Sequence, residues 1–446
     1  MTKPETTGAK PKSQFSLFRS RNFLPLFLTM FLGAFNDNFF KSAMVILITY
    51  RLADAAGVDA RLLVTAAAGV FILPFVIFSA TAGQLADKYE RSMLVRRVKL
   101  IEIIVMSAAV AGFYTGSITL LMTVLFLMGA QSTLFGPLKY SILPQHLGPD
   151  DLIGANALIE TGTFLAILIG TIFGGVFVLG DWGIFTVSLL VIGVAAAGWA
   201  ASWFVPKTKV INPFLEFRFN IAKETWKLVS DVWPRRDIFL SIVAISWFYF
   251  VGGTFLSQFP TYAKIVIGAN ERVATLFLAV FSVGIGLGSL ACNGLLKGEI
   301  SGRYVPWAAL GISGTSIGLY FASLRPPISE EGALVTVTQF VTSIPNWAVL
   351  ACLLGISFFG GLYIVPLYAI IQSRSTEDRL ASVTACCNVM DSLFMVISSV
   401  ATTLMLGAGF SIPQVFLTLA ALTVIASFVI RSAVREQMRR GGSVRE

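Results

Sequence analysis

The chain has 446 residues, of which 56% are hydrophobic and only 13% are charged, and its mean hydropathy is +0.79. A soluble globular domain carries about a quarter charged residues, so this composition excludes a soluble enzyme or a soluble binding module. The net charge of +9 is accounted for by loops that face anionic lipid headgroups, and it requires no nucleic-acid partner.

The first 20 residues are polar and basic, with neither an apolar core nor a small-residue cleavage site. We expect a disordered cytoplasmic tail at 1–20 rather than a secretory signal peptide. Apolar runs follow, each long enough to cross a bilayer core of about 30 Å. They predict twelve membrane spans, near 23–50, 62–85, 98–115, 118–143, 152–179, 182–205, 238–266, 273–296, 304–323, 346–372, 380–407 and 412–430.

The distribution of Lys and Arg predicts the orientation. Cations gather in the tail, between the second and third spans, between the sixth and seventh spans, and after the twelfth. Lys99, at the start of the third predicted span, is counted with the loop cations Lys88, Arg91, Arg96 and Arg97. Because positive loops are retained in the cytoplasm, we expect both termini to be cytoplasmic. The predicted domains are a six-helix bundle at 21–205, an amphipathic cytoplasmic connection at 206–236, a second six-helix bundle at 237–431 and a cytoplasmic tail at 432–446.

The connection alternates large apolar residues such as Trp226 and Trp233 with charged ones such as Lys223 and Lys227. This pattern is typical of a helix that lies in the headgroup plane, and the alternative is a short soluble helix that caps the bundle. Six spans on each side of a basic connection indicate parallel repeats, the internal symmetry of major facilitator transporters. The predicted fold class is an all-α membrane protein with twelve transmembrane helices in the major facilitator fold.

The loop after the second span contains Gly83, Asp87 and Arg91 in a pattern that resembles the G-x-L-a-D-x-x-x-R signature of the major facilitator superfamily. In that family the aspartate pairs with cations at a helix end and locks the two halves together on the cytoplasmic side. We therefore predict that these three residues form a conformational lock. The counterpart after the eighth span has Gly298 at the position of Asp87, so no second lock is expected.

Ionisable groups within the spans are the sharpest functional signal, because each costs a few kcal/mol to insert unless it faces a polar cavity or a partner. Asn36, Asp37 and Asn38 form a polar cluster in the first span, and Lys41 follows Asp37 by one helical turn. A simple intrahelical ion pair between Asp37 and Lys41 is the structural alternative. The two asparagines extend the polar surface and favour a substrate-binding cluster.

Three further charged groups fall within later spans. Lys139 follows a Gly136-Pro137 pair, which we expect to interrupt the helix, although snorkelling of the lysine toward the cytoplasm is an alternative. Glu160 lies on a polar stripe of the fifth span, and Asp391 is the comparable carboxylate of the eleventh. We predict that Lys139 and Glu160 bind substrate, that Asp391 is a second-half polar site, and that these charges neutralise one another across a central cavity.

No motif predicts chemistry on a substrate. His146 is the only histidine, the four cysteines have no metal-ligand spacing, and no phosphate-binding Gly-rich loop is present. We therefore expect no metal, no cofactor, no catalytic residue and no enzyme activity. Glycines are concentrated in the fifth and eighth spans, where small residues allow either sliding at a gate between the halves or tight static packing. They are Gly162, Gly170, Gly174, Gly175, Gly284, Gly286 and Gly288.

Three segments carry a family resemblance. They are residues 35–41, beginning Phe-Asn-Asp-Asn, residues 136–144, beginning Gly-Pro-Leu-Lys-Tyr, and residues 152–160, ending in Glu160. The chain resembles the bacterial lysophospholipid transporter family of the major facilitator superfamily, with the resemblance confined largely to the first half.

The resemblance implies inward flipping of lysophospholipids, chiefly lysophosphatidylethanolamine, from the outer to the inner leaflet of the bacterial inner membrane for reacylation. The expected partners are lysophospholipid, membrane lipids and, as a candidate, a membrane-associated acyltransferase. A zwitterionic headgroup needs a cation for its phosphate and a carboxylate for its ammonium. Lys139, with Asp37 or Glu160, would supply them. Two alternatives remain: a proton-coupled exporter of small amphiphiles, and a non-transporting scaffold for an acyltransferase.

Overall fold

A computed structural model describes residues 13–53, 57, 60–218, 220–324 and 334–442. Most of the predicted N-terminal tail and the last four residues lie outside this part of the chain. The first half contains six long helices: α1 (Leu24–Leu47), α3 (Ala60–Lys88), α4 (Arg91–Thr115), α5 (Ile118–His146), α6 (Pro149–Phe177) and α7 (Gly183–Ser202). The second half contains α9 (Arg236–Thr261), α10 (Glu271–Leu296), α11 (Val305–Ala322), α13 (Trp347–Arg374), α14 (Leu380–Gly407) and α15 (Ile412–Gly442).

Among the described residues, eleven helices are long and apolar enough to cross a membrane, and the shorter apolar stretch Ile412–Phe428 in α15 makes a twelfth. The predicted all-α fold of twelve spans in two six-helix halves is confirmed. The halves also share a local irregularity. The first helix of each half ends in a π-helical turn, Ile48–Leu52 after α1 and Tyr262–Val266 after α9, as repeats related by symmetry would.

Two local predictions are wrong. Helix α5 continues through Pro137 and Pro144 without interruption, so the Gly-Pro pair does not break the fourth span. Neighbouring helices within a bundle can satisfy the backbone groups that a proline frees. Helix α4 begins at Arg91, seven residues before the predicted start of the third span at 98, because Glu90 adopts an extended conformation and ends the preceding turn. Lys99 therefore lies inside a membrane-spanning helix rather than in a cytoplasmic loop.

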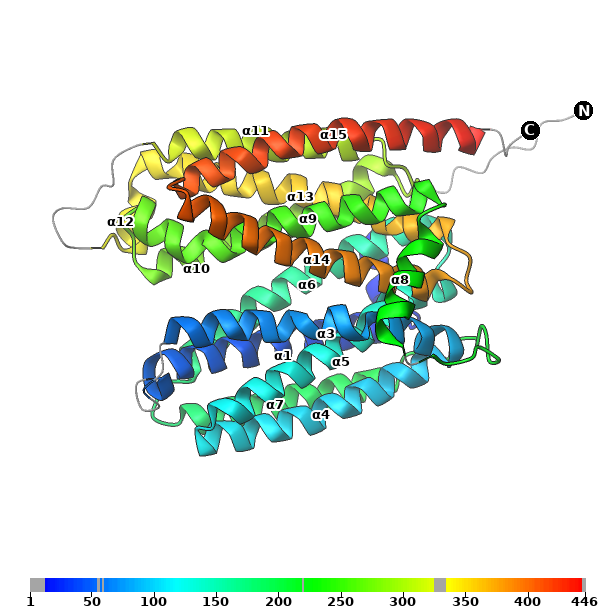
Figure 1. Ribbon diagram of the computed structural model, residues 1–446, viewed down its shortest axis with the longest axis horizontal. Coiled ribbons are helices and arrows are strands. Elements are labelled where there is room, and N and C mark those ends of the chain that lie inside the picture. The colour runs from blue at the N-terminus through cyan, green and yellow to red at the C-terminus, as the bar shows by residue number, and fades with distance from the viewer. Residues whose placement is uncertain (1–12, 54–56, 58–59, 219, 325–333, 443–446) are drawn as a thin grey trace, which may run out of the picture.

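One end of the bundle, which we call the basic end, carries the α3–α4 turn and the connection between the halves. Within the connection lies α8 (Ile221–Val232). Asn220 caps its N-terminus, and the Asn220 side chain accepts a hydrogen bond of 3.0 Å from the backbone N–H of Lys223. Figure 1 shows α8 lying across the bundle, roughly perpendicular to the long helices. The helix packs against α3 of the first half and α14 of the second. The predicted amphipathic connection thus bridges the two halves.

The N-terminal segment differs from its prediction. Residues Gln14–Arg19 form a short 3-10 helix, η1, with Leu17 buried. Phe18 places its ring edge-on to Phe27 of α1, with ring centroids 4.9 Å apart. Because this aromatic packing anchors the segment on α1, the expectation of a disordered tail is wrong for these residues.

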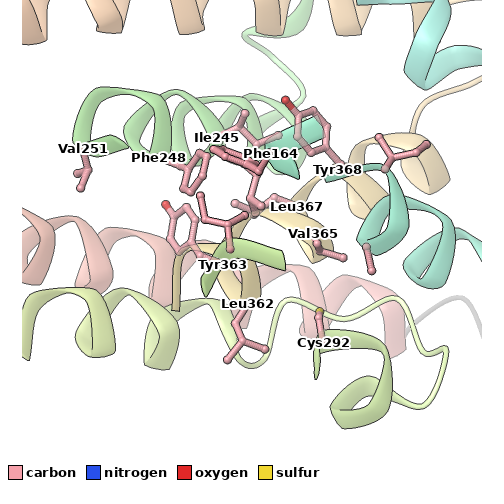
Figure 2. Packing of buried hydrophobic residues seen from close by; sticks show 14 of the residues in the cluster. Phe164, Ile245, Phe248, Val251, Cys292, Leu362, Tyr363, Val365, Leu367 and Tyr368 are labelled. Atoms are coloured by element: carbon pink, nitrogen blue, oxygen red, sulfur yellow. The ribbon is translucent and has the colours of Figure 1, made fainter. Parts of the chain in front are cut away.

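The apolar core is not continuous along the molecule. The larger buried cluster joins both halves and includes Phe164 of α6 together with Ile245, Phe248 and Tyr368 of the second half, as Figure 2 shows. The smaller cluster consists of first-half residues only, including Phe39, Phe113 and Val187 near the end opposite the basic end, which we call the far end. The halves therefore pack together toward the basic end, and the first half has its own core at the far end.

Candidate functional site

The predicted lock residues join the two halves at the basic end. Ser382 of α14 donates a hydrogen bond of 2.5 Å to the carboxylate of Asp87 on α3, across the seam between the halves. The Arg91 guanidinium lies 3.5 Å from the same carboxylate and donates to the backbone carbonyl of Glu377, at 3.1 Å. A Cβ on Gly83 would lie 2.9 Å from that of Ala385, so only glycine allows α3 and α14 to approach this closely. All three predicted residues thus lie at one contact between the halves.

A second group of contacts closes the seam deeper in the bundle. Asn156 of α6 donates a hydrogen bond of 2.6 Å to the side-chain oxygen of Gln372 on α13. The Gln372 amide in turn donates to the backbone carbonyl of Tyr140, at 3.3 Å. The rings of Tyr140 and Tyr368 stack across the halves with centroids 4.1 Å apart and planes 12° apart. Because these side chains are buried, they form a second layer of contact between the halves, deeper in the bundle than the lock residues.

Only one of the predicted glycines faces the other half. Gly286 of α10 lies opposite Thr161 of α6, whose hydroxyl donates a hydrogen bond of 3.2 Å to the Gly286 carbonyl. Gly170 and Gly174 pack instead against the backbone of α1, within the first half, and Gly284 and Gly288 pack against α13. The α6–α10 border predicted for a gate is a contact between the halves, whereas most of its glycines serve packing inside each half.

The polar cluster of α1 is divided between two partners. Asp37 accepts a hydrogen bond of 2.6 Å from the hydroxyl of Ser132 on α5. Within the described residues it makes no ion pair with Lys41, whose ammonium lies over the Phe71 ring, 4.9 Å from the centroid. The alternative of an intrahelical Asp37–Lys41 pair is therefore wrong. Asn38 bonds only its own helix, through the Ala34 carbonyl at 2.8 Å.

Beneath this cluster lies an ion pair that the sequence reasoning missed. Lys99 and Glu102 of α4 approach to 2.6 Å, and each side chain is only 1% exposed. The Glu102 carboxylate also accepts hydrogen bonds from Asn36 of α1, at 3.0 Å, and from Gln131 of α5, at 3.3 Å. These two donors immediately precede Asp37 and Ser132 in the chain. The pair thus fixes α1 and α5 at the position where Asp37 meets its partner.

The spacing of Lys99 and Glu102, three residues apart on one helix, was the available signal for this pair. This signal is easily overlooked, because Lys99 is the last of several cations in 88–99 and is counted with them as a loop residue when the sequence alone is considered. Once α4 is known to begin at Arg91, both side chains must lie within the bundle.

The remaining predicted charges each have a partner in their own half. Glu160 is buried and accepts a hydrogen bond of 2.6 Å from the Tyr140 hydroxyl. Asp391, also buried, accepts one of 2.7 Å from Ser246 on α9. Lys139 is partly exposed, and its ammonium lies over the Tyr140 ring, 4.7 Å from the centroid. Among the described residues no ion pair joins these three, and their mutual neutralisation across a central cavity stays a prediction.

The charged residues predicted for the site differ in how far they are buried. Asp37 of α1 and Lys139 of α5 are half-buried residues, whereas Glu160 and Asp391 are buried and accept hydrogen bonds from Tyr140 and Ser246. The described residues contain no group of three or more His, Cys, Asp or Glu side chains that could hold a metal ion. What this arrangement offers is a separated cation and carboxylate, which suits binding of a ligand that carries both charges.

Known proteins share this architecture. Residues 26–337 match the family model described as Major Facilitator Superfamily. The chain belongs to the Major Facilitator Superfamily. Solved members of the superfamily share its fold: the proton:xylose symporter XylE has a TM-score of 0.68 at 14% identity, covering 95% of this chain and 96% of that one. A bacterial homologue of the iron transporter ferroportin, in its outward-facing state, has a TM-score of 0.63 at 14% identity, with 92% and 98% covered.

Curated relatives within the superfamily agree with the resemblance drawn from residues 35–41, 136–144 and 152–160. The lysophospholipid transporter LplT of Cronobacter sakazakii is 28% identical over 371 residues, which are 81% of this chain and 83% of that protein. LplT of Salmonella gallinarum is 28% identical over 362 residues, or 80% and 81% of the two chains. The predicted resemblance is confirmed. Membership of this family indicates that the protein is a multi-pass membrane transporter rather than an enzyme.

Proposed function

We propose that this protein is a secondary transporter or flippase of lysophospholipids, with lysophosphatidylethanolamine as the principal cargo. The observation that carries the proposal is a carboxylate and a cation within two helices of the first half, the half-buried residues Asp37 on α1 and Lys139 on α5, in an arrangement whose seam is closed at the basic end. The similarity to relatives named lysophospholipid transporters supports the same cargo. A phosphoethanolamine headgroup carries the complementary pair of charges.

In this proposal Lys139 binds the phosphate and Asp37 binds the ammonium. Asn36 and Asn38 complete the polar surface of α1, and Asn36 is fixed by its hydrogen bond to Glu102. Of the two carboxylates expected for the ammonium, Asp37 is the better assignment, because Glu160 is buried and already accepts the Tyr140 hydroxyl. Glu160 and Asp391 then act through their hydrogen-bond partners, because they hold the side chains of Tyr140 and Ser246 in place.

The orientation proposed for the basic end supports inward transport. Because positive loops are retained in the cytoplasm, we assign the basic end and both termini to the cytoplasmic side of the bacterial inner membrane. Within the described part of the chain, the side-chain hydrogen bonds between the halves lie in the basic-end part of the spans, so we assign this arrangement to a state that is closed to the cytoplasm. It would take lysophospholipid from the outer leaflet and deliver it inward for reacylation. An acyltransferase that receives the cargo stays a prediction.

A leaflet-specific uptake assay in proteoliposomes tests the assignment. Asp37→Asn and Lys139→Met each remove a charge-assisted contact worth about 1.5–3 kcal/mol, so each should weaken uptake of lysophosphatidylethanolamine tenfold or more. Matched controls are Glu271→Gln and Lys264→Met, exposed charges at the far end, which should leave uptake unchanged. Normal uptake by both site variants would overturn the headgroup assignment.

A proton-coupled exporter of small amphiphiles is the second candidate. One carboxylate oxygen of Asp37, Oδ1, is buried and has no hydrogen-bond partner, as expected of a carboxyl that exchanges a proton. In that mechanism transport stops when the proton gradient is dissipated by an ionophore. A lysophospholipid flippase that moves its cargo down the lipid's own gradient would continue to transport, so the same liposomes distinguish the two functions.

A further inference from the structure

A groove on the outer surface of the first half has no role in the proposed transport cycle. It has a volume of about 300 Å³ and lies at the basic end, between the start of α1 and the end of α7. Its apolar wall consists of Leu24, Leu28, Ala201 and Phe204, and Arg19 and Arg21 line it as well. The groove therefore combines a hydrocarbon surface with two cations.

The two arginines carry charge that the protein does not balance. Both are exposed, and within the described residues neither side chain makes a hydrogen bond or an ion pair. No acidic residue lines the groove. An anion from outside the chain is therefore the complementary partner, and arginine binds phosphate more specifically than any other side chain because its planar group can donate two parallel hydrogen bonds.

The depth of the groove matches the headgroup layer of a membrane. Trp203 and Phe204 follow α7 directly and are 57% and 65% exposed. Exposed tryptophans at the end of a spanning helix mark the level of the lipid headgroups. Arg96 lies over the Trp203 ring, 5.4 Å from the centroid, which adds a third cation at the same level. The apolar wall then continues into the surface that faces the acyl chains.

We propose that this groove binds one anionic phospholipid of the leaflet at the basic end. Its phosphate is held by Arg19 and Arg21, and one acyl chain lies along Leu24, Leu28 and Phe204. Basic pockets beside spanning helices bind anionic headgroups in this way. A free phosphate ion would use the arginines but not the apolar wall, which is why a lipid is the better occupant.

The bound lipid would act on the seam between the halves through η1. Arg19 is the last residue of this short helix, and Gln14 at its other end donates a hydrogen bond of 3.3 Å to the Leu290 carbonyl of α10, in the second half. The buried Leu17 lies between them and fixes η1 on the first half. A lipid that binds Arg19 therefore stabilises η1, which connects the two halves at the closed basic end. A higher content of anionic lipid would then favour the state that is closed at this end.

Lipid binding to the full-length protein in detergent tests the site directly, without any transport measurement. Native mass spectrometry would give the affinity of the tightest site for dioctanoyl phosphatidylglycerol and for dioctanoyl phosphatidylcholine. Each cation near an anionic headgroup contributes roughly fivefold, so Arg19→Gln/Arg21→Gln should weaken phosphatidylglycerol binding about 25-fold. Phosphatidylcholine binding should weaken much less, because the choline charge offsets that of its phosphate. The matched control is Lys207→Gln/Lys209→Gln, two exposed cations of the connection that do not line the groove.

Two further measurements separate the possible results. Ala201→Trp fills the apolar wall and should weaken lipid binding while both arginines remain, and inorganic phosphate at the same concentration should not displace the lipid. Hydrogen exchange in residues 14–20 should slow in phosphatidylglycerol nanodiscs, and this effect should disappear in the double arginine variant. Equal binding of the two lipids, equal losses in the control variant, or displacement by phosphate alone would each overturn the proposal.

Discussion

Replacement of Lys99 by methionine offers a sharp test of how the first half is held together. The side chains of Lys99 and Glu102 are each 1% exposed, and their charged atoms lie 2.6 Å apart. Methionine fills a similar volume but leaves the Glu102 carboxylate buried without its cation. Removing one member of a buried ion pair costs about 3–5 kcal/mol, and the two remaining donors, Asn36 and Gln131, place the expected loss near the lower limit, at about 3 kcal/mol.

The double variant Lys99→Met/Glu102→Gln separates charge from packing. Both charges are then absent, and the glutamine oxygen can still accept from Asn36 and Gln131, so stability should return to within about 1 kcal/mol of the original protein. The free energy of unfolding would be measured by reversible denaturation in mixed micelles, with Lys264→Met as an exposed control expected to change it by less than about 0.5 kcal/mol. A single variant as stable as the original, or a double variant as unstable as the single, would refute the reasoning.

Two predictions concern the seam. Ser382→Ala removes the hydrogen bond to Asp87, which is worth about 1.5–3 kcal/mol because the acceptor is charged. The population that is open at the basic end should therefore increase at least tenfold. Alkylation of the buried cysteines Cys386 and Cys387 by a maleimide should speed up by the same factor. Gln372→Leu leaves the side chain of Asn156 without its partner across the halves and should accelerate the same alkylation, whereas an unchanged rate would show that the deeper contact does not close the seam.

The number of spans was predictable because hydropathy reports burial in lipid directly, and a Gly-x-x-x-Asp-x-x-x-Arg pattern at one position was enough to locate a contact between the halves. Helix ends were less predictable where charge continues into a span. Arg91 and Lys99 belong to one helix, yet a count of cations assigns both to a loop. Burial of Lys99 depends on Glu102, and a pair of opposite charges three residues apart is equally compatible with an exposed helix face.

Partners across helices were beyond the reach of the sequence. The spacing of Asp37 and Lys41 favours a local ion pair, but the structure gives Asp37 a hydroxyl donor from α5 and places Lys41 over an aromatic ring. Glu160 likewise bonds Tyr140, which precedes it by 20 residues in the preceding helix. Which residues meet is set by the rotation of each helix about its axis, and that rotation depends on packing with every neighbour at once.

Several contacts that join the halves share a property that bears on sequence change. Arg91, Gln14 and Thr161 in the first half each donate to a backbone carbonyl of the second half, those of Glu377, Leu290 and Gly286. A carbonyl is present whatever side chain the residue carries. At Glu377 and Leu290 the second half can therefore substitute residues and keep its bonds to the first, whereas a side chain at Gly286 would lie only 3.1 Å from the Thr161 methyl group. The two halves are thus free to diverge at different rates at such positions, and recognisable family motifs are expected to persist mainly on the donating side.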